Sequence, residues 1–428
     1  METNPQDRRA ERRYQVFVRR NLTRNFSVHL IHGMLGQTGF RLLNAPTFLP
    51  AYVLYLSGSD FAVGMALALQ SLGMALTPLI GANLIEHRAR VLPMGFLTGG
   101  AMRLSVLGIA LSGLLLPPAQ ALLAIYFWLA LFGLLQGMQG VIFNFLMSKV
   151  IPVSKRGRLT GLRNFLAGIT SAGVALLGGT YFLGDNPDAT GSSYTFVLAV
   201  ILPTCGLLSL IFTREPIPPT RRAPSPLLQR LGDIPALLRS DPAFTRYFVA
   251  RSIATAGRMA LPFYILYAGS SMALTGANLA IVTVAFTLAG TVSNLVWGLI
   301  ADRHGFRLVF LLSIALWVIS TMLLIVSSGV LLTSLVFMGI GAAVQGFQHS
   351  AMNLALEFGH RHDLPLRIAI ANSTSEMAGS LGPLLGGAIA ASFGYAALFF
   401  TSVAFLIAGG LMVMLLVPEP RKAANGTL

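Results

Sequence analysis

Charged residues are scarce in this chain. They make up 11% of its 428 residues, whereas a soluble globular domain contains about 25%. Hydrophobic residues make up 54% of the sequence, and the mean hydropathy is +0.71. This composition excludes an ordinary soluble domain. It predicts an all-α membrane protein, because a helix satisfies its own backbone hydrogen bonds in lipid.

Cysteine and catalytic motifs are also missing. The single cysteine, Cys205, lies in an apolar run, which excludes a disulfide framework and a cysteine-based metal site. The sequence contains no G-x-S-x-G, H-E-x-x-H or Walker motif, and its seven histidines are dispersed. We therefore expect no catalytic residue, no metal and no cofactor, and we do not expect an enzyme.

Acidic residues number 15 against 30 Lys and Arg, which gives a net charge of +15. Three arginines, Arg41, Arg103 and Arg258, fall inside apolar runs. All the other basic residues fall on one side when the apolar segments are threaded through a membrane, as the positive-inside rule requires. The basic charge therefore indicates topology and not a nucleic-acid partner, and both termini are expected in the cytoplasm.

Twelve apolar segments have the length of membrane-spanning helices. We predict a basic tail at 1–25, a six-helix bundle at 26–213, a linker at 214–243, a second bundle at 244–417 and a cytoplasmic tail at 418–428. The linker is rich in proline. The predicted spans are 26–56, 61–85, 91–116, 119–148, 159–183, 194–213, 244–268, 277–301, 307–328, 330–358, 367–392 and 394–417.

The N-terminal tail carries seven arginines between residues 8 and 24. Together with Tyr14, Phe17, Val18 and Leu22, they are typical of a basic amphipathic helix on anionic lipid. A basic tail that only sets the topology explains the same composition, so both interpretations stay open.

The two bundles repeat each other in sequence. Residues 49–55 read LPAYVLY and residues 261–267 read LPFYILY, 212 positions on. The pair Gln136 and Gln139 recurs as Gln345 and Gln348, 209 positions on. Matches in the same order at a nearly constant offset indicate an internal duplication.

The stretch 298–307, GLIADRHGFR, is a tight charged turn between two apolar segments. Its pattern G-x-x-x-D-R-x-G-x-R resembles the signature loop of the major facilitator superfamily, which follows the second helix of each six-helix half. The resemblance implies a loop that locks one conformation and releases it. The predicted gating residues are Gly298, Asp302, Arg303, Gly305, Arg307 and, in the first half, Glu86.

We expect two of these residues to act in defined ways. Gly298 is small enough to let two helix backbones approach closely. Asp302 is expected to pair with a basic group near the end of the fifth helix, such as Arg158 or Arg163, and so to stabilise the outward-open form.

The resemblance covers nearly the whole chain and implies two six-helix bundles that alternate access to a site near the middle of the membrane. It also implies that helices 1, 4, 7 and 10 line the path. The chain departs from drug exporters of this family. The fourth helix reads GLLQG at 133–137, without the arginine of R-x-x-Q-G, and the Gly-Pro motif lies on the eleventh helix as Gly382 and Pro383.

Polar side chains at membrane depth are costly and therefore mark candidate functional positions. The predicted substrate-pathway residues are Gln37, Arg41, Asn44, Gln136, Gln139, Arg258, Gln345 and Gln348. Hydrogen bonding between helices is the alternative role for each glutamine. The candidates for proton coupling are Glu376, His32 and His349. Arg103, Gly382 and Pro383 are interpreted as structural, with Arg103 paired to Glu376 or to backbone carbonyls.

Three buried arginines against one buried glutamate predict a positive cavity. We expect a secondary transporter in the bacterial inner (plasma) membrane that acts as a monomer, contacts lipid and moves a small anionic or amphiphilic organic solute, with or without protons. A proton-linked multidrug exporter is one alternative. The other is a membrane scaffold or assembly factor that moves nothing, and a sealed apolar interior would distinguish it from a transporter.

Overall fold

The computed structural model of the chain describes residues 5–86, 88–185, 187–217, 234–358 and 364–418. At some of these positions only the backbone is described, Glu86 and Glu376 among them. Within the described ranges the regular elements are all helical. We call α2 to η2 the N-terminal half and α12 to α17 the C-terminal half.

The elements of the first part are α1 (Pro5–Arg20), α2 (Leu22–Asn44), α3 (Phe48–Ser57), α4 (Asp60–Leu76), α5 (Pro78–Glu86), α6 (Leu92–Leu115), α7 (Pro118–Val150), α8 (Val153–Leu177), η1 (Gly178–Leu183), α9 (Ala189–Ser209) and η2 (Leu210–Phe212). The elements of the second part are α11 (Ile234–Ser240), α12 (Pro242–Ala256), η3 (Gly257–Phe263), α13 (Tyr264–Ala268), α14 (Gly276–His304), α15 (Phe306–Ile325), α16 (Gly329–Leu356) and α17 (Leu364–Leu416).

Eight helices of the described residues are long and apolar enough to cross a membrane. Proline shortens three of the predicted spans, because it lacks the backbone N–H and clashes with the preceding turn. The chain breaks around Pro46 and before Pro78, and Pro262 lies in the 3₁₀ segment η3. The last two predicted spans appear as one element, α17, which turns at Gly394, where φ is 81°. Helix α2 is 23 residues long but is not among the eight, so the count of twelve spans stays a prediction.

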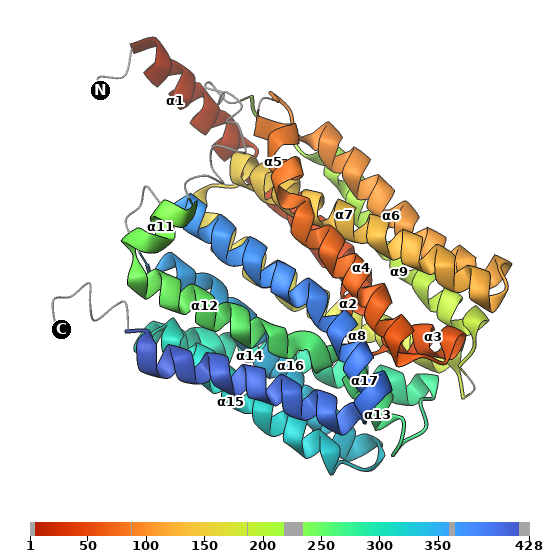
Figure 1. Cartoon of the computed structure of the whole chain (residues 1–428). Helices are drawn as coiled ribbons and strands as arrows, with labels where there is room; N and C mark the ends of the chain where they lie inside the picture. Colours follow the sequence, from red (N-terminus) through yellow and green to blue (C-terminus); the bar gives the residue numbers. More distant parts are fainter. Residues whose placement is uncertain (1–4, 87, 186, 218–233, 359–363, 419–428) are drawn as a thin grey trace.

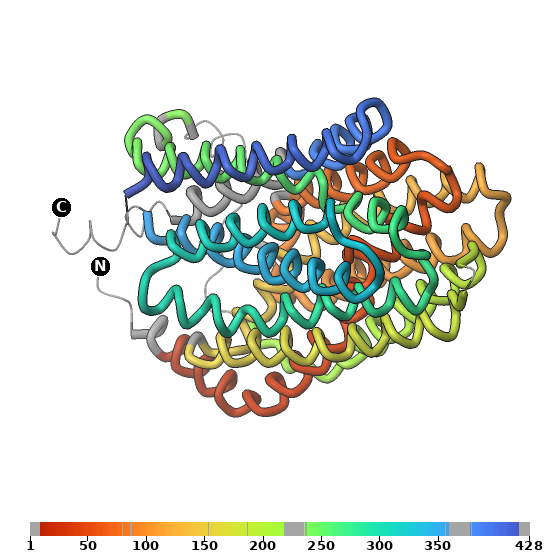
Figure 2. Tube along the Cα trace, turned by 90° about the horizontal axis from the view of Figure 1, so that it is seen from below, coloured from red at the N-terminus to blue at the C-terminus, as the bar shows by residue number. Residues whose placement is uncertain are grey.

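The long helices run roughly parallel, and the two halves lie side by side (Figures 1 and 2). One end of the molecule holds α1, α11 and the end of α17, and we call it the basic end. The other end holds α3, α13 and the turn at Gly394, and we call it the short-loop end (Figure 1). The halves meet through α4 against α17 and through α8 and η1 against α14.

A buried ion pair ties the chain together at the basic end of the N-terminal half. Lys149 Nζ lies 2.5 Å from Glu215 Oε1, and both side chains are almost fully buried. The Glu215 carboxylate also accepts the backbone N–H groups of Val91 (2.7 Å) and Leu92 (3.0 Å) at the start of α6. Because a carboxylate is favourable at a helix N-terminus, Glu215 holds the chain after η2 against α6 and α7.

Candidate functional site

A polar cavity of about 810 Å³ lies between the two halves. Its walls come from α2, α4 and α7 on one side and from α12, η3, α14, α16 and α17 on the other. Pro46 and Pro262 both line this cavity. The irregular backbone between α2 and α3 and that of η3 therefore border it. The polar side chains in the wall are Arg41, Asn44, Gln70, Ser71, Gln136, Asn144, Arg251, Thr255, Arg258, Thr287, Thr291, Asn294, Gln345 and Gln348.

Contacts between the halves close the cavity toward the short-loop end. The Gly276 N–H donates to the Gly184 carbonyl oxygen (2.7 Å), and Thr283 Oγ1 donates to Thr47 Oγ1 (2.7 Å). The Tyr395 hydroxyl donates to Asp60 Oδ1 across the same end (2.7 Å). A solute cannot pass between helices joined this closely unless the helices separate. The short-loop end is therefore shut.

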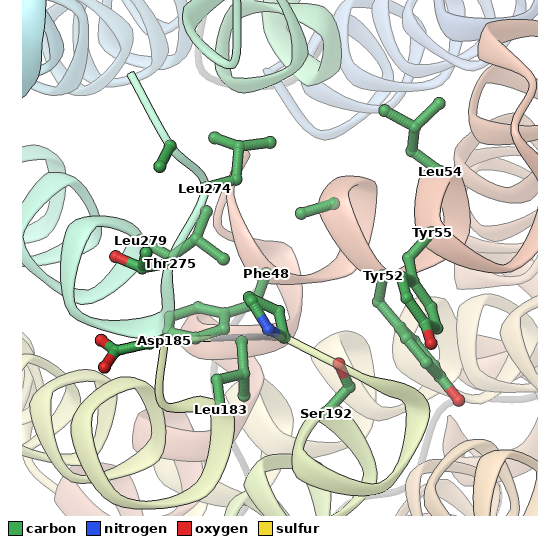
Figure 3. Close-up of a pocket in the computed structure, with 13 residues that line it drawn as sticks. Phe48, Tyr52, Leu54, Tyr55, Leu183, Asp185, Ser192, Leu274, Thr275 and Leu279 are labelled. Carbon is green, nitrogen blue, oxygen red and sulfur yellow. The ribbon is translucent and has the colours of Figure 1, made fainter.

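A second, smaller cavity of about 340 Å³ lies outside this closure. Figure 3 shows Leu183 and Asp185 of the N-terminal half facing Leu274 and Thr275 of the C-terminal half. Phe48 on α3 lines this cavity, whereas Pro50, two residues on, lines the central one. Helix α3 therefore separates the two spaces.

The central cavity opens at the basic end. Its wall reaches Asn144, six residues before the end of α7, and Met352, four residues before the end of α16. Both side chains are exposed, as is Gln348, one turn deeper on α16. Among the described residues, the polar wall is therefore accessible from the basic end and closed at the short-loop end.

Arg41 lies near the middle of the cavity, in the last turn of α2. Its guanidinium donates to Thr291 Oγ1 of the opposite half (3.3 Å) and to Gln37 Oε1 one turn back (3.4 Å). Both partners are neutral and both bonds are long, so the positive charge is not balanced by these contacts.

Arg251 and Arg258 bring two more cations to the wall from the opposite half. Arg258 lies in η3, and a Cβ placed on Gly379 of α17 would be 3.4 Å from its Nη1. The glycine thus gives the guanidinium room to pass α17. Glu376, the proposed counter-charge, is three residues before Gly379 on the same helix, and its side chain lies outside the described residues.

Carboxamides make up most of the remaining polar wall. Gln70 Nε2 donates to Asn44 Oδ1 (2.6 Å), which joins α4 to the end of α2. Gln136 Oε1 on α7 and Asn294 Oδ1 on α14 are buried and have no hydrogen-bond partner among the described residues. A buried acceptor without a donor costs about 1–3 kcal/mol, and these two oxygens belong to residues that line the cavity from opposite halves.

Comparison with known proteins finds relatives among membrane transporters. A family model described as Major Facilitator Superfamily matches residues 247–427, less than half of the chain. The C-terminal half is therefore similar to the major facilitator superfamily. A stretch of 139 residues is 29% identical to an uncharacterized MFS-type transporter of Mycobacterium tuberculosis, and it covers 32% of this chain. The match spans about a quarter of that curated relative, 24% of its length.

Solved structures of three transporters share the fold over at least 90% of the chain. A nucleoside transporter is 13% identical with a TM-score of 0.72, and the match covers 90% of this chain and 99% of that one. A D-xylose-proton symporter is 14% identical with a TM-score of 0.72, covering 94% and 99%. A POT family transporter in complex with 5-aminolevulinic acid is 11% identical with a TM-score of 0.69, covering 94% and 96%.

Six of the eight predicted pathway residues line the cavity: Arg41, Asn44, Gln136, Arg258, Gln345 and Gln348. Gln37 is outside the wall and reaches it through its contact with Arg41. Gln139 points into the N-terminal half, where its Oε1 accepts from Thr98 (2.5 Å) and its Nε2 donates to the Gly95 carbonyl (3.3 Å). It therefore joins α7 to α6 and does not border the cavity.

The two histidine candidates are also outside the cavity wall. His32 is buried in the N-terminal half, where its ring stacks on Phe143 with the centroids 4.2 Å apart. His349 is exposed on α16 beside Gln348, but it is not part of the wall. Neither lines the cavity, and the side chain of the third candidate, Glu376, lies outside the described residues.

Arg103 is held by backbone carbonyls. Its Nε donates to Pro203 O (2.8 Å) and its Nη1 to Gly99 O (2.6 Å), while its guanidinium lies over the Phe40 ring. The sequence suggested either Glu376 or backbone carbonyls as partners of Arg103. The contacts described in the structure are with carbonyls. On α17, Gly382 packs against Met259 at ordinary contact distance, and Pro383 borders the cavity.

The hairpin at 298–307 differs in part from the expectation. A Cβ on Gly298 would meet nothing within 4 Å, so the expected close approach of backbones is absent in this conformation. Arg163 is not at the hairpin; its guanidinium lies over the Phe143 ring inside the N-terminal half.

The remaining hairpin residues lie at the surface of the basic end. Gly305 adopts a φ of 87° at the turn, and Arg307 Nη2 donates to the Met414 carbonyl of α17 (2.7 Å). Asp302 and Arg303 are exposed. The backbone of Glu86 ends α5, and its side chain lies outside the described residues.

Several cavity residues were missed by the sequence reasoning, among them Gln70, Asn144, Thr287, Thr291 and Asn294. Each is a polar residue inside an apolar segment, so the rule that selected the glutamines would have found them. Arg251, Thr255 and Arg258 share one stripe of the seventh segment, at spacings i, i+4 and i+7, and all three line the cavity.

Proposed function

We propose that this protein is a secondary transporter that moves a small hydroxylated organic anion through the central cavity by alternating access. The observation that carries the proposal is the polar cavity between the halves, shut by direct contacts at one end and accessible at the other. This is the arrangement that an alternating-access cycle needs in one of its two states.

The polarity of the cavity favours transport over a scaffold. A scaffold without transport needs no water-accessible polar side chains at membrane depth, which are expensive to insert. Here arginine and carboxamide side chains border a space of about 810 Å³, which is within the usual range for a small-molecule site.

The charge of the wall favours an anion. Arg41, Arg251 and Arg258 border the cavity, and the described lining residues include no Asp or Glu. Arg41 in particular has only neutral hydrogen-bond partners. A guanidinium presents a planar fork that matches a carboxylate or phosphate, so a bound anion would offset the cost of burying the Arg41 cation.

The carboxamides favour a solute that also donates hydrogen bonds. Gln136 Oε1 and Asn294 Oδ1 are buried acceptors on opposite halves without a described donor. Hydroxyl groups of the solute would satisfy both oxygens and bridge the two halves. A sugar acid or a small hydroxy acid has this combination of negative charge and hydroxyls.

The proposal also includes the orientation of the protein in the membrane and the coupling of transport to protons. The basic end faces the cytoplasm of a bacterial inner membrane, as the distribution of Lys and Arg requires, so this conformation is open inward. Glu376, three residues from the glycine that receives Arg258, is the residue proposed to carry a coupled proton.

Transport in proteoliposomes tests the proposal. A thermal-shift screen with hydroxy acids, sugar acids, neutral sugars and cationic drugs selects solutes, because a ligand that binds the native state raises its melting temperature. Uptake of the best solute is then measured with and without a pH gradient. Stabilisation by cationic drugs alone contradicts the anion proposal, and binding without any flux contradicts the transporter.

A further inference from the structure

Helix α1 lies outside the predicted membrane spans and has two unlike faces. One face contacts the N-terminal half at the basic end: the Tyr14 hydroxyl donates to the Lys149 carbonyl (3.0 Å), and Val18, one turn on, is 4% exposed. Burial raises the pKa of Tyr14, so its hydroxyl keeps the proton that it donates. This face attaches α1 to the junction formed by Lys149 and Glu215.

The opposite face is basic. At about 100° per residue, Arg9, Arg12, Arg13 and Arg20 project on the side of the helix away from Tyr14. These arginines are exposed, as is Arg19 beside them. The one described carboxylate of α1, Glu11, lies toward the bundle side and accepts a hydrogen bond from Gln15. Among the described side chains of α1, none therefore neutralises the cationic face.

Apolar side chains interrupt this basic face. Val16 is 64% exposed and lies among the arginines, and Phe17 at its edge is 39% exposed. Exposed apolar side chains gain nothing from water, whereas an apolar centre surrounded by arginines matches the boundary between lipid headgroups and acyl chains.

The covalent structure places α1 at such a boundary. Asn21 is the only residue between α1 and α2, and α2 enters the bundle directly. Tyr14 is level with Lys149 in the last turn of α7, so the second half of α1 lies beside the ends of the apolar helices.

We propose that the outer face of α1 is a binding surface for anionic phospholipid headgroups of the leaflet at the basic end. The arginines bind the lipid phosphates through their planar forks, and Val16 and Phe17 enter the headgroup region. Because the inner face is attached to Lys149, the lipid also fixes the position of the N-terminal half in that leaflet. This surface is independent of the central cavity and of what is transported.

A fluorescent label on α1 tests the proposal. Val16→Cys is made in a Cys205→Ala background, labelled with an environment-sensitive dye, and the full-length protein is reconstituted into nanodiscs of phosphatidylcholine alone or with phosphatidylglycerol. We expect a blue shift with phosphatidylglycerol that disappears at about 1 M salt, where the Debye length falls to about 3 Å. Equal emission in the two kinds of nanodisc would overturn the proposal.

Matched variants separate the α1 surface from general basic charge. Arg12, Arg13 and Arg20 are changed together to Gln in one variant, and Arg88, Arg90 and Arg158, also exposed, in the other. The first variant should lose the shift and the second should keep it. Equal loss in both overturns the assignment to α1. A shift produced by a soluble polyanion such as heparin, with none from anionic lipid, shows that the surface binds another partner and also overturns it.

Discussion

Gly179 of η1 and Gly276 of α14 touch each other backbone to backbone across the two halves. A Cβ on Gly179 would lie 2.2 Å from the Gly276 carbonyl oxygen, and a Cβ on Gly276 would lie 2.1 Å from the Gly179 oxygen. Neither position has space for a methyl group, and in both cases the obstacle is backbone. The closure of the short-loop end therefore depends on two glycines that face each other.

Alanine at either glycine should hold the short-loop end open. Gly179→Ala and Gly276→Ala add a methyl group that the closed state cannot accept, at a cost of about 1–3 kcal/mol. This cost shifts the ratio of the two states by about 5- to 150-fold. Spin labels on the two halves at the short-loop end should report a longer distance, and transport should fall accordingly.

Gly173→Ala is the control for this prediction. Gly173 lies on α8, less than two turns before Gly179, and a Cβ there would meet nothing within 4 Å. This variant should keep the distances and the transport rate of the unmodified protein. If Gly173→Ala and Gly179→Ala behave alike, the contact between the two glycines does not control the closure.

The ion pair of Lys149 and Glu215 should stabilise the N-terminal half strongly. Glu215→Gln removes the charge that faces Lys149 and weakens the cap on α6, and breaking a buried pair by removing one partner costs about 3–5 kcal/mol. The melting temperature in detergent should drop. Adding Lys149→Met should recover part of the loss, because the cation is then no longer buried alone.

Glu11→Gln is the matched control for the ion pair, because Glu11 is exposed and its described partner is neutral Gln15. Its melting temperature should change little. If the double variant is less stable than Glu215→Gln by the full cost of Lys149→Met alone, the two residues do not interact.

Much of the fold follows from hydropathy and from proline positions. The apolar segments, the short turns and the division into two similar halves depend on local patterns that a sequence displays directly. The breaks at Pro46 and Pro262 also have a local cause, yet their consequence, irregular backbone in the cavity wall, appears only when the two halves are packed together.

The direction of polar side chains could not be predicted in the same way. Gln136 borders the cavity while Gln139, three residues on, binds α6. The two residues differ by less than one helical turn, and the rotation of α7 relative to its neighbours decides which one meets solvent. His32 and Arg163 were assigned from residue type, but both pack on Phe143 inside the N-terminal half. The close contact of Gly179 with Gly276 depends on tertiary packing alone.

The two ends of the molecule should label from opposite sides of the membrane. In a Cys205→Ala background, a cysteine at Asp188 should react with an impermeant maleimide added to intact cells, since Asp188 begins α9 at the short-loop end. A cysteine at Arg88, between α5 and α6, should react only after the cells are opened. Reaction of both cysteines from the same side would contradict the proposed orientation.

The last prediction concerns the charge preference of the cavity. Arg41→Lys keeps the positive charge but loses the planar fork, so uptake of an anionic solute should weaken by about 10-fold or more, the effect of a charged hydrogen bond of about 1.5–3 kcal/mol. Arg41→Gln should weaken it further, and Arg258→Lys should act in the same direction. Uptake of the neutral ester of the same solute should change little in all three variants.

The competing explanation is that these arginines serve the fold by pairing with Glu376. In that case Glu376→Gln should lower the melting temperature as much as Arg258→Gln does, and the anion and its ester should lose uptake equally. Arg103→Lys supplies the reference for a structural arginine, because its guanidinium is bound to the carbonyls of Pro203 and Gly99 and does not border the cavity. It should reduce stability and affect both solutes alike. The anion site therefore requires a selective loss in the Arg41 variants that Arg103→Lys does not reproduce.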